Sequence, residues 1–543
     1  MSSLWQDIRV AVRGYAKEPL FTLAVLAILG LGMGANSAIF SFVYGVLLRP
    51  LDYPHASELL DISQRNSETG QRQLMSPPNY FDLREQIQTS MGLAAYWTPN
   101  VTITGTGGVP EKVLAARCSS SIFDVVDVRP IAGRAFIADD DVSGARRVAV
   151  IAHGLWQRRF GADPAAIGRE LTLDRMPTLI VGVMPPDFAF PVAGTELWVP
   201  LRLSRTQPPN PAITPGAYRG YNILSVVGRL KPGVTAEEAR AELALVGAQL
   251  ARAHPETNRH TELTAESLQD AVVGPIRPAL LLLLGAVACV LLIACANIAS
   301  LLLVRAIRRS REITIRMALG ADRARLARQM FTESLVLALA GAGIGVVVSA
   351  WLLDLLLRVA PPGIPRLEQV RIGGGVMAFT LLIALAAGLL FGLAPAFQVR
   401  SHRLHDALVA LGRGLVAGAQ QRARQALVVG EIALSLMLLI GATLLIQSFA
   451  RIQQVDVGFR SAAVLTIDRI ELPPGRTAAA SSAAFFESLV RALRNVPGVE
   501  SAAVTLGLPL DPRARFSSTK ARSQFPVSRR FLRPTGHPPR CMS

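Results

Sequence analysis

Few residues in this chain have the types and spacing that chemistry requires. The acidic triplet Asp139–Asp141 could offer oxygens to calcium, but a hard cation needs six or more of them around it, so a solvated loop is the better interpretation. His402 and His405 lack further ligands, which favours a basic flank over a metal site. No H-E-x-x-H, G-x-S-x-G or G-K-[ST] sequence occurs. We therefore expect no enzyme activity, no metal and no cofactor.

The composition is typical of a chain that lies partly in a membrane. With 543 residues, 51% of them hydrophobic, and a mean hydropathy of +0.37, the chain is too apolar for a wholly soluble protein and too polar to be entirely embedded. The net charge of +17 does not predict nucleic-acid binding, because much of the arginine flanks apolar stretches and no basic stripe with interleaved aromatic residues occurs. Four scattered cysteines predict neither a disulfide nor a zinc site: Cys118, Cys289, Cys295 and Cys541.

Five apolar stretches are long enough to cross a bilayer as helices. They lie at residues 20–48, 278–304, 331–357, 376–399 and 426–449. The first could instead be a cleaved signal peptide, but the apolar region of such a peptide is about half as long, so we expect an uncleaved helix. The sequence thus predicts a polytopic α-helical membrane protein.

Small and polar residues inside these stretches predict how the helices pack. Asn297 is the one strongly polar residue of the second stretch, and its amide is expected to bond with another helix. The stretches lack ionisable residues near their centres, which argues against a self-sufficient secondary transporter. Glycines four residues apart let helices approach closely. The glycines expected in such contacts are Gly30 and Gly34, Gly341 and Gly345, and Gly388 and Gly392.

The region 50–276 has the composition of a folded domain with mixed α and β structure. A T-x-x-E capping box, Thr235 with Glu238, predicts the start of a helix that runs to residue 254. Trp156 and Phe160 are expected on the buried face of a short helix. Runs of β-branched and apolar residues predict strands at 145–151, 170–173 and 178–183.

Arginine is distributed unevenly between the two ends of the predicted spans. The loop 305–330 carries eight arginines and the segment after the fourth span five more, whereas the short loop between the third and fourth spans carries three. Because positive charge accumulates on the cytoplasmic side, we expect residues 1–19 inside and the domain 50–276 outside. Asp354 and Arg358 are expected to form an ion pair near the outer end of the third span.

The loop 305–330 has the pattern of two helices joined by a sharp corner. Arg308, Glu312 and Arg316 are spaced i, i+4, i+8 and so share one helical face. Gly320 can adopt the left-handed conformation that ends a helix, and Asp322 is well placed to cap the next one.

The pattern R-E-I-x-I-R-x-A-L-G-A-x-R-x-x-L-x-R-Q-x-x-x-E-S, from Arg311 to Ser334, resembles the cytoplasmic loop of MacB/FtsX-type permeases of ABC transporters. The resemblance implies a coupling helix that docks on a separate ATP-hydrolysing subunit. The alternative is a basic loop whose helix rests on lipid headgroups. The residues that the resemblance implies in contact with the ATPase are Arg311, Glu312, Arg316, Leu319, Gly320 and Ala321.

Other stretches resemble further parts of the same family. The phrases SPPNYFDLREQ, GLWQRRFGADPAAIGRELTL, VGVMPPDFAFP and GRLKPGVTAEEARAEL are similar to the MacB-like periplasmic core domain, and 278–399 corresponds to the FtsX-like permease domain. After the fifth span, residues 450–514, with a helix expected at 483–493, resemble the start of a second core domain, as in the duplicated ADOP-type permeases. Residues 515–543 contain no acid and match nothing expected there. We interpret them as an aberrant basic tail after a truncated second half.

These observations predict the permease subunit of an ABC transporter in a bacterial inner membrane. The resemblance implies mechanotransmission: a cytoplasmic ATPase, expected to be a dimer, would drive the periplasmic domain to export or extract a substrate. A periplasmic adaptor or a second permease are possible partners besides the bilayer, and no nucleic acid is expected. Two alternatives remain, namely a membrane receptor or scaffold that transports nothing, and a permease inactivated by truncation.

Overall fold

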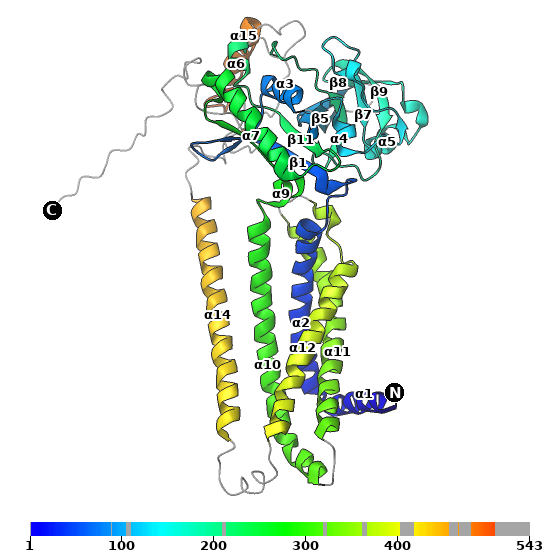
Figure 1. The fold of residues 1–543 in the computed structure, drawn as a ribbon, viewed down its shortest axis with the longest axis vertical. Helices are drawn as coiled ribbons and strands as arrows, with labels where there is room; N and C mark the ends of the chain where they lie inside the picture. The colour runs from blue at the N-terminus through cyan, green and yellow to red at the C-terminus, as the bar shows by residue number, and fades with distance from the viewer. Residues whose placement is uncertain are drawn as a thin grey trace, which may run out of the picture. The chain divides into compact units, whose positions relative to one another are not determined.

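The structure is a computed structural model that describes residues 2–87, 89–104, 110–208, 213–318, 323–360, 366–401, 417–454, 465 and 479–504. The chain divides into two units (Figure 1). The first, here called the α+β domain, is built on Tyr53–Leu268. The second, here called the helical unit, consists of Met1–Asp52 and Gln269–Val464. The helical unit thus includes a short segment, 269–276, that the sequence analysis placed in the domain 50–276.

Twelve strands of the α+β domain form one hydrogen-bonded sheet. Their pairing order is β10-β7-β9-β8-β4-β5-β3-β11-β1-β12, with β2 added on β1 and β6 on β9. Strand β10 also pairs with β5 in parallel, so β5, β4, β8, β9, β7 and β10 close into a ring. The strands are β1 (Leu59–Asn66), β2 (Arg72–Gln73), β3 (Met91–Trp97), β4 (Asn100–Thr104), β5 (Glu111–Cys118), β6 (Ala132–Gly133), β7 (Val148–Ile151), β8 (Glu170–Leu173), β9 (Met176–Val183), β10 (Thr195–Pro200), β11 (Ser225–Leu230) and β12 (Thr261–Ser267).

Each half of this sheet has its own hydrophobic core. Inside the ring, apolar residues of β4, β5, β7, β8 and β9 pack together with fully buried Leu155 of α5. On the open half, α3 and α7 cover the sheet, and Leu243 of α7 is among the buried residues. The predicted capping box is confirmed, because Thr235 and Glu238 bond to each other's backbone N–H. Helices of this domain are α3 (Pro77–Gln86), α4 (Ile122–Val126), α5 (His153–Phe160), α6 (Pro215–Tyr218), α7 (Ala236–Ala253) and α8 (Pro255–Asn258), with 3-10 turns η2 (Ala56–Glu58), η3 (Ala138–Asp141) and η4 (Pro164–Ala166).

Among the described residues of the helical unit, five helices are long and apolar enough to cross a membrane. Their apolar stretches are Pro19–Leu48, Arg277–Leu302, Arg328–Val359, Gly374–Phe391 and Gln425–Gln453. The helices of this unit are α1 (Ser2–Ala16), α2 (Pro19–Phe42) with the π-helical turn η1 (Val43–Leu48), α9 (Leu268–Val273), α10 (Arg277–Ala318), α11 (Arg323–Val359), η5 (Leu367–Gln369), α12 (Gly374–Ser401) and α14 (Ala417–Gln453).

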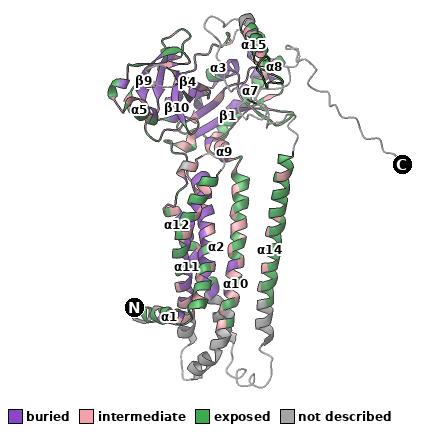
Figure 2. Ribbon diagram, turned by 180° about the vertical axis from the view of Figure 1, so that it is seen from behind, coloured by how far each residue is buried: buried purple, intermediate pink, exposed green. Residues whose placement is uncertain are grey.

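Helix α2 lies at the centre of the helical unit. It packs against α10, α11 and α12, and half of its residues are buried, as Figure 2 shows by colour. Helix α14 packs on α10 and is largely exposed along its length. Helix α1 does not run with the others but crosses their ends, where it packs on α11 (Figure 1). A separate helix, α15 (Ala479–Arg494), occupies the place of the helix expected at 483–493. Most of 450–514 and all of 515–543 lie outside the described residues.

Candidate functional site

The coupling segment predicted at 305–330 is built on two long helices. Helix α10 runs without interruption for 42 residues, which is about 63 Å, although its apolar stretch ends at Leu302. The predicted residues Arg311, Glu312 and Arg316 lie on the part of α10 that extends beyond the apolar stretch. Helix α11 begins at residue 323. The predicted corner, with Leu319, Gly320, Ala321 and Asp322, lies outside the described residues.

Two of the glycine pairs interlock where α2 meets α11. A methyl group placed on Gly30 would lie 2.6 Å from Cγ2 of Ile344, and one on Gly34 would lie 2.7 Å from Cγ1 of Val348. From the other side, a methyl group on Gly341 would lie 2.6 Å from Cβ of Leu29, and Gly345 faces Met33 in the same way. Each helix therefore inserts a side chain where the other has none, and the two backbones lie close together.

The third glycine pair lies on α12. A methyl group on Gly388 would approach the side chain of Leu335 of α11 to 3.2 Å, so this glycine also allows a close helix contact. Gly392 belongs to the same helix, but its surroundings lie outside the part of the chain that the structure describes. Helix α11 is thus packed between α2 and α12, with glycine at both contacts.

Polar groups of α2 make interhelical hydrogen bonds that the sequence analysis missed. The side-chain amide of Asn36 donates to the backbone carbonyl of Val287 on α10 at 2.8 Å. The hydroxyls of Ser37 and Thr380 on α12 are 2.7 Å apart and share a hydrogen bond. All three polar side chains are buried. The signal was the same as for Asn297, since a buried amide in an apolar stretch needs a partner.

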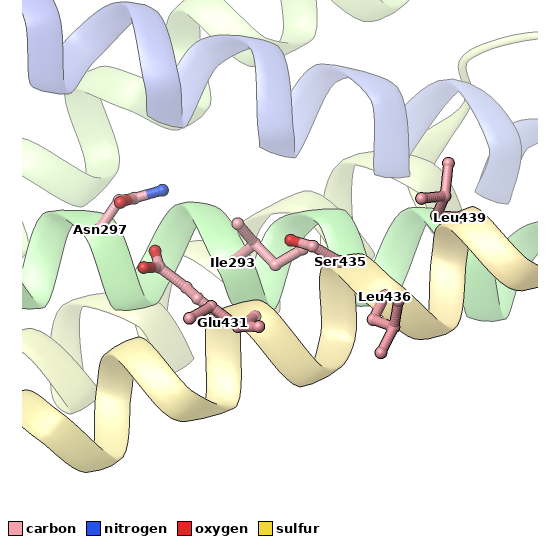
Figure 3. Close-up of a pocket in the computed structure, with 7 residues that line it drawn as sticks. Ile293, Asn297, Glu431, Ser435, Leu436 and Leu439 are labelled. Atoms are coloured by element: carbon pink, nitrogen blue, oxygen red, sulfur yellow. The ribbon is translucent and has the colours of Figure 1, made fainter.

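Asn297 and Ile293 of α10 line one side of a shallow pocket of about 480 Å³ between α10 and α14 (Figure 3). Glu431 and Ser435 of α14 line the same pocket. One carboxylate oxygen of Glu431, Oε1, is buried and has no hydrogen-bond partner in the described structure. Glu431 lies five positions inside the predicted fifth span and well short of its centre, so it does not contradict the expectation that the spans lack ionisable residues near their centres.

The loop after α11 is bonded to the segment that follows α2. The guanidinium of Arg366 donates to the backbone carbonyls of Arg49 and Pro50, both at 2.7 Å. Gln369 donates to the carboxylate of Asp52, also at 2.7 Å. The predicted ion pair between Asp354 and Arg358 is confirmed at 2.7 Å, and both side chains are exposed. These bonds join the loop after α11 to the chain that leads from α2 into the α+β domain.

The acidic triplet of the α+β domain is structural, and the expectation of a solvated loop is wrong for two of its members. Asp140 accepts hydrogen bonds from Arg134 at 2.6 and 3.1 Å and from the N–H of Ile137 at 2.9 Å. Burial alone would raise the pKa of Asp140, but these bonds outweigh it and lower that pKa. Asp141 accepts the N–H groups of Arg202 and Ser120. The described residues contain no cluster of three or more side chains that could hold a metal ion.

The two aromatic residues of α5 lie against the ring core. Trp156 and Phe160 are partly buried there, and the indole N–H of Trp156 donates to the carbonyl of Asp163 at 2.9 Å. They are thus packing residues, and Leu155 is the fully buried member of this helix.

Another buried acid, Asp61, lies on β1. It forms an ion pair with Arg72 of β2, and Glu266 on the neighbouring strand β12 shares that arginine. Burial raises the pKa of Asp61 to about 6, and the nearby charge of Glu266 adds to this, whereas Arg72 opposes it without cancelling it.

Two known family models match the chain. Residues 22–246 match the model of the MacB-like periplasmic core domain, and residues 284–404 match the model of the FtsX-like permease C-terminal domain. The first matched segment includes α2 and most of the α+β domain, and the second includes α10, α11 and α12 through residue 401. An α+β domain joined to such a set of apolar helices defines a polytopic membrane permease.

Curated relatives match this chain over part of their own, longer sequences. The chain is 26% identical over 424 residues to the macrolide export ATP-binding/permease protein MacB of Rhodopseudomonas palustris, covering 75% of this chain and 60% of that protein. It is 27% identical over 303 residues to the probable syringafactin export ATP-binding/permease protein SyfD of Pseudomonas syringae pv. tomato, covering 54% and 41%. A solved periplasmic region of MacB from Actinobacillus actinomycetemcomitans aligns with 44% of this chain and 97% of its own at 14% identity and a TM-score of 0.30. The chain spans between about a half and two thirds of the length of the first two MacB relatives.

The matches to both domain models identify the chain as a MacB/FtsX-type permease of ABC transporters. It is accordingly a membrane protein of the bacterial inner membrane.

Proposed function

We propose that this permease transmits the work of a separate cytoplasmic ATPase to the α+β domain on the opposite side of the membrane, and so exports or extracts a substrate. The observation that carries this proposal is the unbroken course of α10. About 24 Å of this helix extends beyond the apolar stretch that ends at Leu302, and the coupling residues Arg311, Glu312 and Arg316 lie on that extension. A force applied there acts on the same rigid element that lies in the membrane.

The contacts between the helices support transmission of such a force. Helix α2 bonds to α10 through Asn36 and interlocks with α11 through paired glycines, so these helices have little freedom to slide past one another. From α2 the chain leads through η1 into the α+β domain, and Arg366 fastens the loop after α11 to this connection. The mechanism needs no solute channel through the helices. ATP closure of a dimeric ATPase, docked at 311–321, supplies the force, and an adaptor or a second permease completes the assembly.

The test is affinity capture of the solubilised full chain from its own membranes, followed by measurement of ATP hydrolysis in the eluate. In the test variant, Glu312→Ala and Leu319→Asp alter the coupling segment together. Since the loss of an interface hot spot weakens binding by 2 kcal/mol or more, we expect the captured ATPase activity to fall at least about tenfold.

A matched control applies the same two kinds of change at the other end of α11, as Asp354→Ala with Leu355→Asp. Both positions are exposed, and this variant should retain the ATPase activity of the parent. Equal hydrolysis in the eluates of parent and test variant would contradict the proposal. An eluate of the parent that hydrolyses no ATP would contradict it as well, and would favour a receptor or scaffold.

A further inference from the structure

The amino-terminal helix α1 contacts both ends of the coupling segment 305–330. Its buried residues, Asp7, Ala11 and Tyr15, share one face of the helix. The opposite side carries exposed Arg9 and Arg13. The buried face packs on α11, and the turn after α1 reaches α10. The sequence analysis treated 1–19 only as a basic cytoplasmic terminus and gave it no role.

Two bonds fasten α1 to the start of α11. The carboxylate of Asp7 accepts a hydrogen bond from Nε of Arg328 at 3.1 Å, and only 8% of Asp7 is exposed. One helical turn further along α11, the hydroxyl of Tyr15 donates to the backbone carbonyl of Glu333 at 2.9 Å. Only the aspartate of this ion pair is buried, since 44% of the Arg328 side chain is exposed. Loss of the arginine would leave the buried carboxylate of Asp7 without its partner, which is costly.

Arg305, at the other end of the coupling segment, lies against the end of α1, the turn after it and the start of α2. Its guanidinium carbon is 5.0 Å from the ring centre of Tyr15 and 4.8 Å from that of Phe21. Nε of Arg305 is 3.2 Å from the carboxylate of Glu18, and the arginine side chain is only 10% exposed. Its two Nη atoms are buried and make no hydrogen bond within the described structure. The two rings and Glu18 therefore hold the charge, through cation–π contacts and one ion pair.

The acids of the first 20 residues match the arginines at the two ends of the coupling segment. Asp7 and Glu18 are the only acids in the first 20 residues, and Arg305 and Arg328 are the first and last of the eight arginines in the coupling segment. Each of these acids pairs with one of these two arginines. The arginines between Arg305 and Arg328 repel one another. This repulsion favours a larger distance between the two ends of the coupling segment, unless other contacts hold those ends.

We propose that residues 2–21, which comprise α1, the turn that follows it and the first residues of α2, form a bracket that fixes the spacing of α10 and α11 where the coupling segment leaves the membrane. Asp7, Tyr15, Glu18 and Phe21 are positioning residues that act through Arg305 and Arg328. The inference rests on the proposed function for its purpose, since the bracket would hold the segment in the shape that the ATPase binds. The bracket itself is a property of this chain alone and is tested without the ATPase.

The first experiment is limited trypsin digestion of the purified full chain in detergent. The variants Asp7→Asn with Glu18→Gln, and Tyr15→Leu, change only the bracket and leave every arginine of the segment in place. We expect cleavage within 305–328 to become about tenfold faster. Without the partners of Arg305 and Arg328, the ends of α10 and α11 that carry these arginines separate more often. Tyr15→Phe keeps the ring and loses one hydrogen bond, so its cleavage should stay within about threefold of the parent.

Asp354→Asn is the control for charge, since it removes one exposed acid at the far end of α11 and should leave cleavage unchanged. Thermal unfolding of the α+β domain is recorded for each variant to show that the rest of the chain stays folded. Should the double variant fail to fold, Asp7→Asn alone is used, with a threefold increase expected. Cleavage of folded Asp7→Asn or of Tyr15→Leu at the rate of the parent would overturn the bracket.

A second readout separates the bracket from the proposed function. Asp7→Arg should reduce the ATPase activity captured with the chain, and Arg328→Asp added to it should restore the activity by rebuilding the ion pair in reverse. A residue that merely stabilises the fold would not give this rescue. If digestion responds as expected while no ATPase is captured by the parent, the bracket stands and the proposed function fails. Loss of activity that the reversed pair does not restore would contradict a positioning role for Asp7.

Discussion

At the scale of single residues, the carboxyl group of Asp61 has a raised pKa. It is 4% exposed on β1, and burial raises its pKa to about 6, even though it pairs with Arg72. In the unfolded chain an aspartate titrates near 3.8. The folded domain therefore binds this proton more tightly than the unfolded chain does, in the pH range between these two values.

The sign of the pH effect follows from this difference. The contribution of Asp61 to stability is complete below about pH 4 and is lost as the pH rises through about 6. We expect Asp61→Asn, which cannot ionise, to remove this pH dependence, a change of at most about 3 kcal/mol between pH 4 and pH 7. The measurement is the thermal unfolding of the α+β domain in the full chain at several pH values, followed by tryptophan fluorescence.

Only the difference between parent and variant is informative, because other groups titrate in the same range. Glu262→Gln on the neighbouring strand β12 is a suitable control, since it also replaces a carboxylate by an amide but at an exposed position, opposite Arg65 of β1. If the parent and Asp61→Asn lose stability in parallel from pH 4 to pH 7, Asp61 does not carry a raised pKa.

The acidic triplet shows why single side chains are hard to predict from sequence. Three consecutive aspartates in a polar region indicate solvation, yet Asp140 is buried because Arg134, six residues earlier, reaches it with two hydrogen bonds. Asp141 is held by N–H groups of Ser120 and Arg202, which are far away in the sequence. Partners at such distances along the chain depend on the tertiary fold and leave no local pattern.

At the scale of elements, α2 and α11 pack closely through interlocking glycines. Gly341 and Gly343 on α11 provide a matched pair of sites two residues apart. A methyl group on Gly341 would lie 2.6 Å from Cβ of Leu29, whereas one on Gly343 would meet nothing within 4 Å. The same substitution should therefore destabilise the helical unit at Gly341 and have little effect at Gly343.

We expect Gly341→Leu to destabilise the helical unit by about 1–3 kcal/mol or more, since it forces the two helices apart. Gly343→Leu should change the stability by less than about 0.5 kcal/mol. Unfolding of the full chain by increasing fractions of sodium dodecyl sulfate in mixed micelles measures both. Equal destabilisation at the two positions would show that the α2–α11 contact is not formed as described.

Elements with local signals were predictable. The capping box at Thr235 identified the start of α7, and the predicted strands at 170–173 and 178–183 are β8 and β9. The closure of the ring of strands was not predictable from the sequence, because β10 pairs in parallel with β5, some 80 residues earlier. The uninterrupted α10 was also unexpected in its length, although a helix on both sides of residue 304 was predicted.

At the scale of the whole molecule, the proposed function requires the α+β domain and the extension of α10 to lie on opposite sides of the membrane. We expect a cysteine in place of Ser143, an exposed residue of the α+β domain, to react with a membrane-impermeant maleimide in spheroplasts. A cysteine in place of Ser310, on the extension of α10, should react only after the membrane is opened. Both variants need a background in which the four native cysteines are replaced. Labelling of residue 310 in intact spheroplasts would reverse the proposed orientation.

The family of this protein was accessible from sequence because its signals are long and ordered, as from Arg311 to Ser334. The sequence did not predict which charged residues pair with each other across the molecule. Neither the pairing of Asp7 with Arg328 nor the position of Glu431 beside Asn297 follows from local spacing, since each joins helices that are distant in the sequence.

The central position of α2 also constrains how the protein is made. Helix α2 ends at Phe42, but α11, whose side chains fill its glycine notches, begins only at Arg323. At about 5–20 residues per second, ribosomes need on the order of 15–60 s to synthesise the intervening chain, and the α+β domain is synthesised in that interval. The carbonyl of Val287, which accepts the amide of Asn36, is synthesised earlier, with α10. The helix on which the others assemble is therefore made before either of these partners exists.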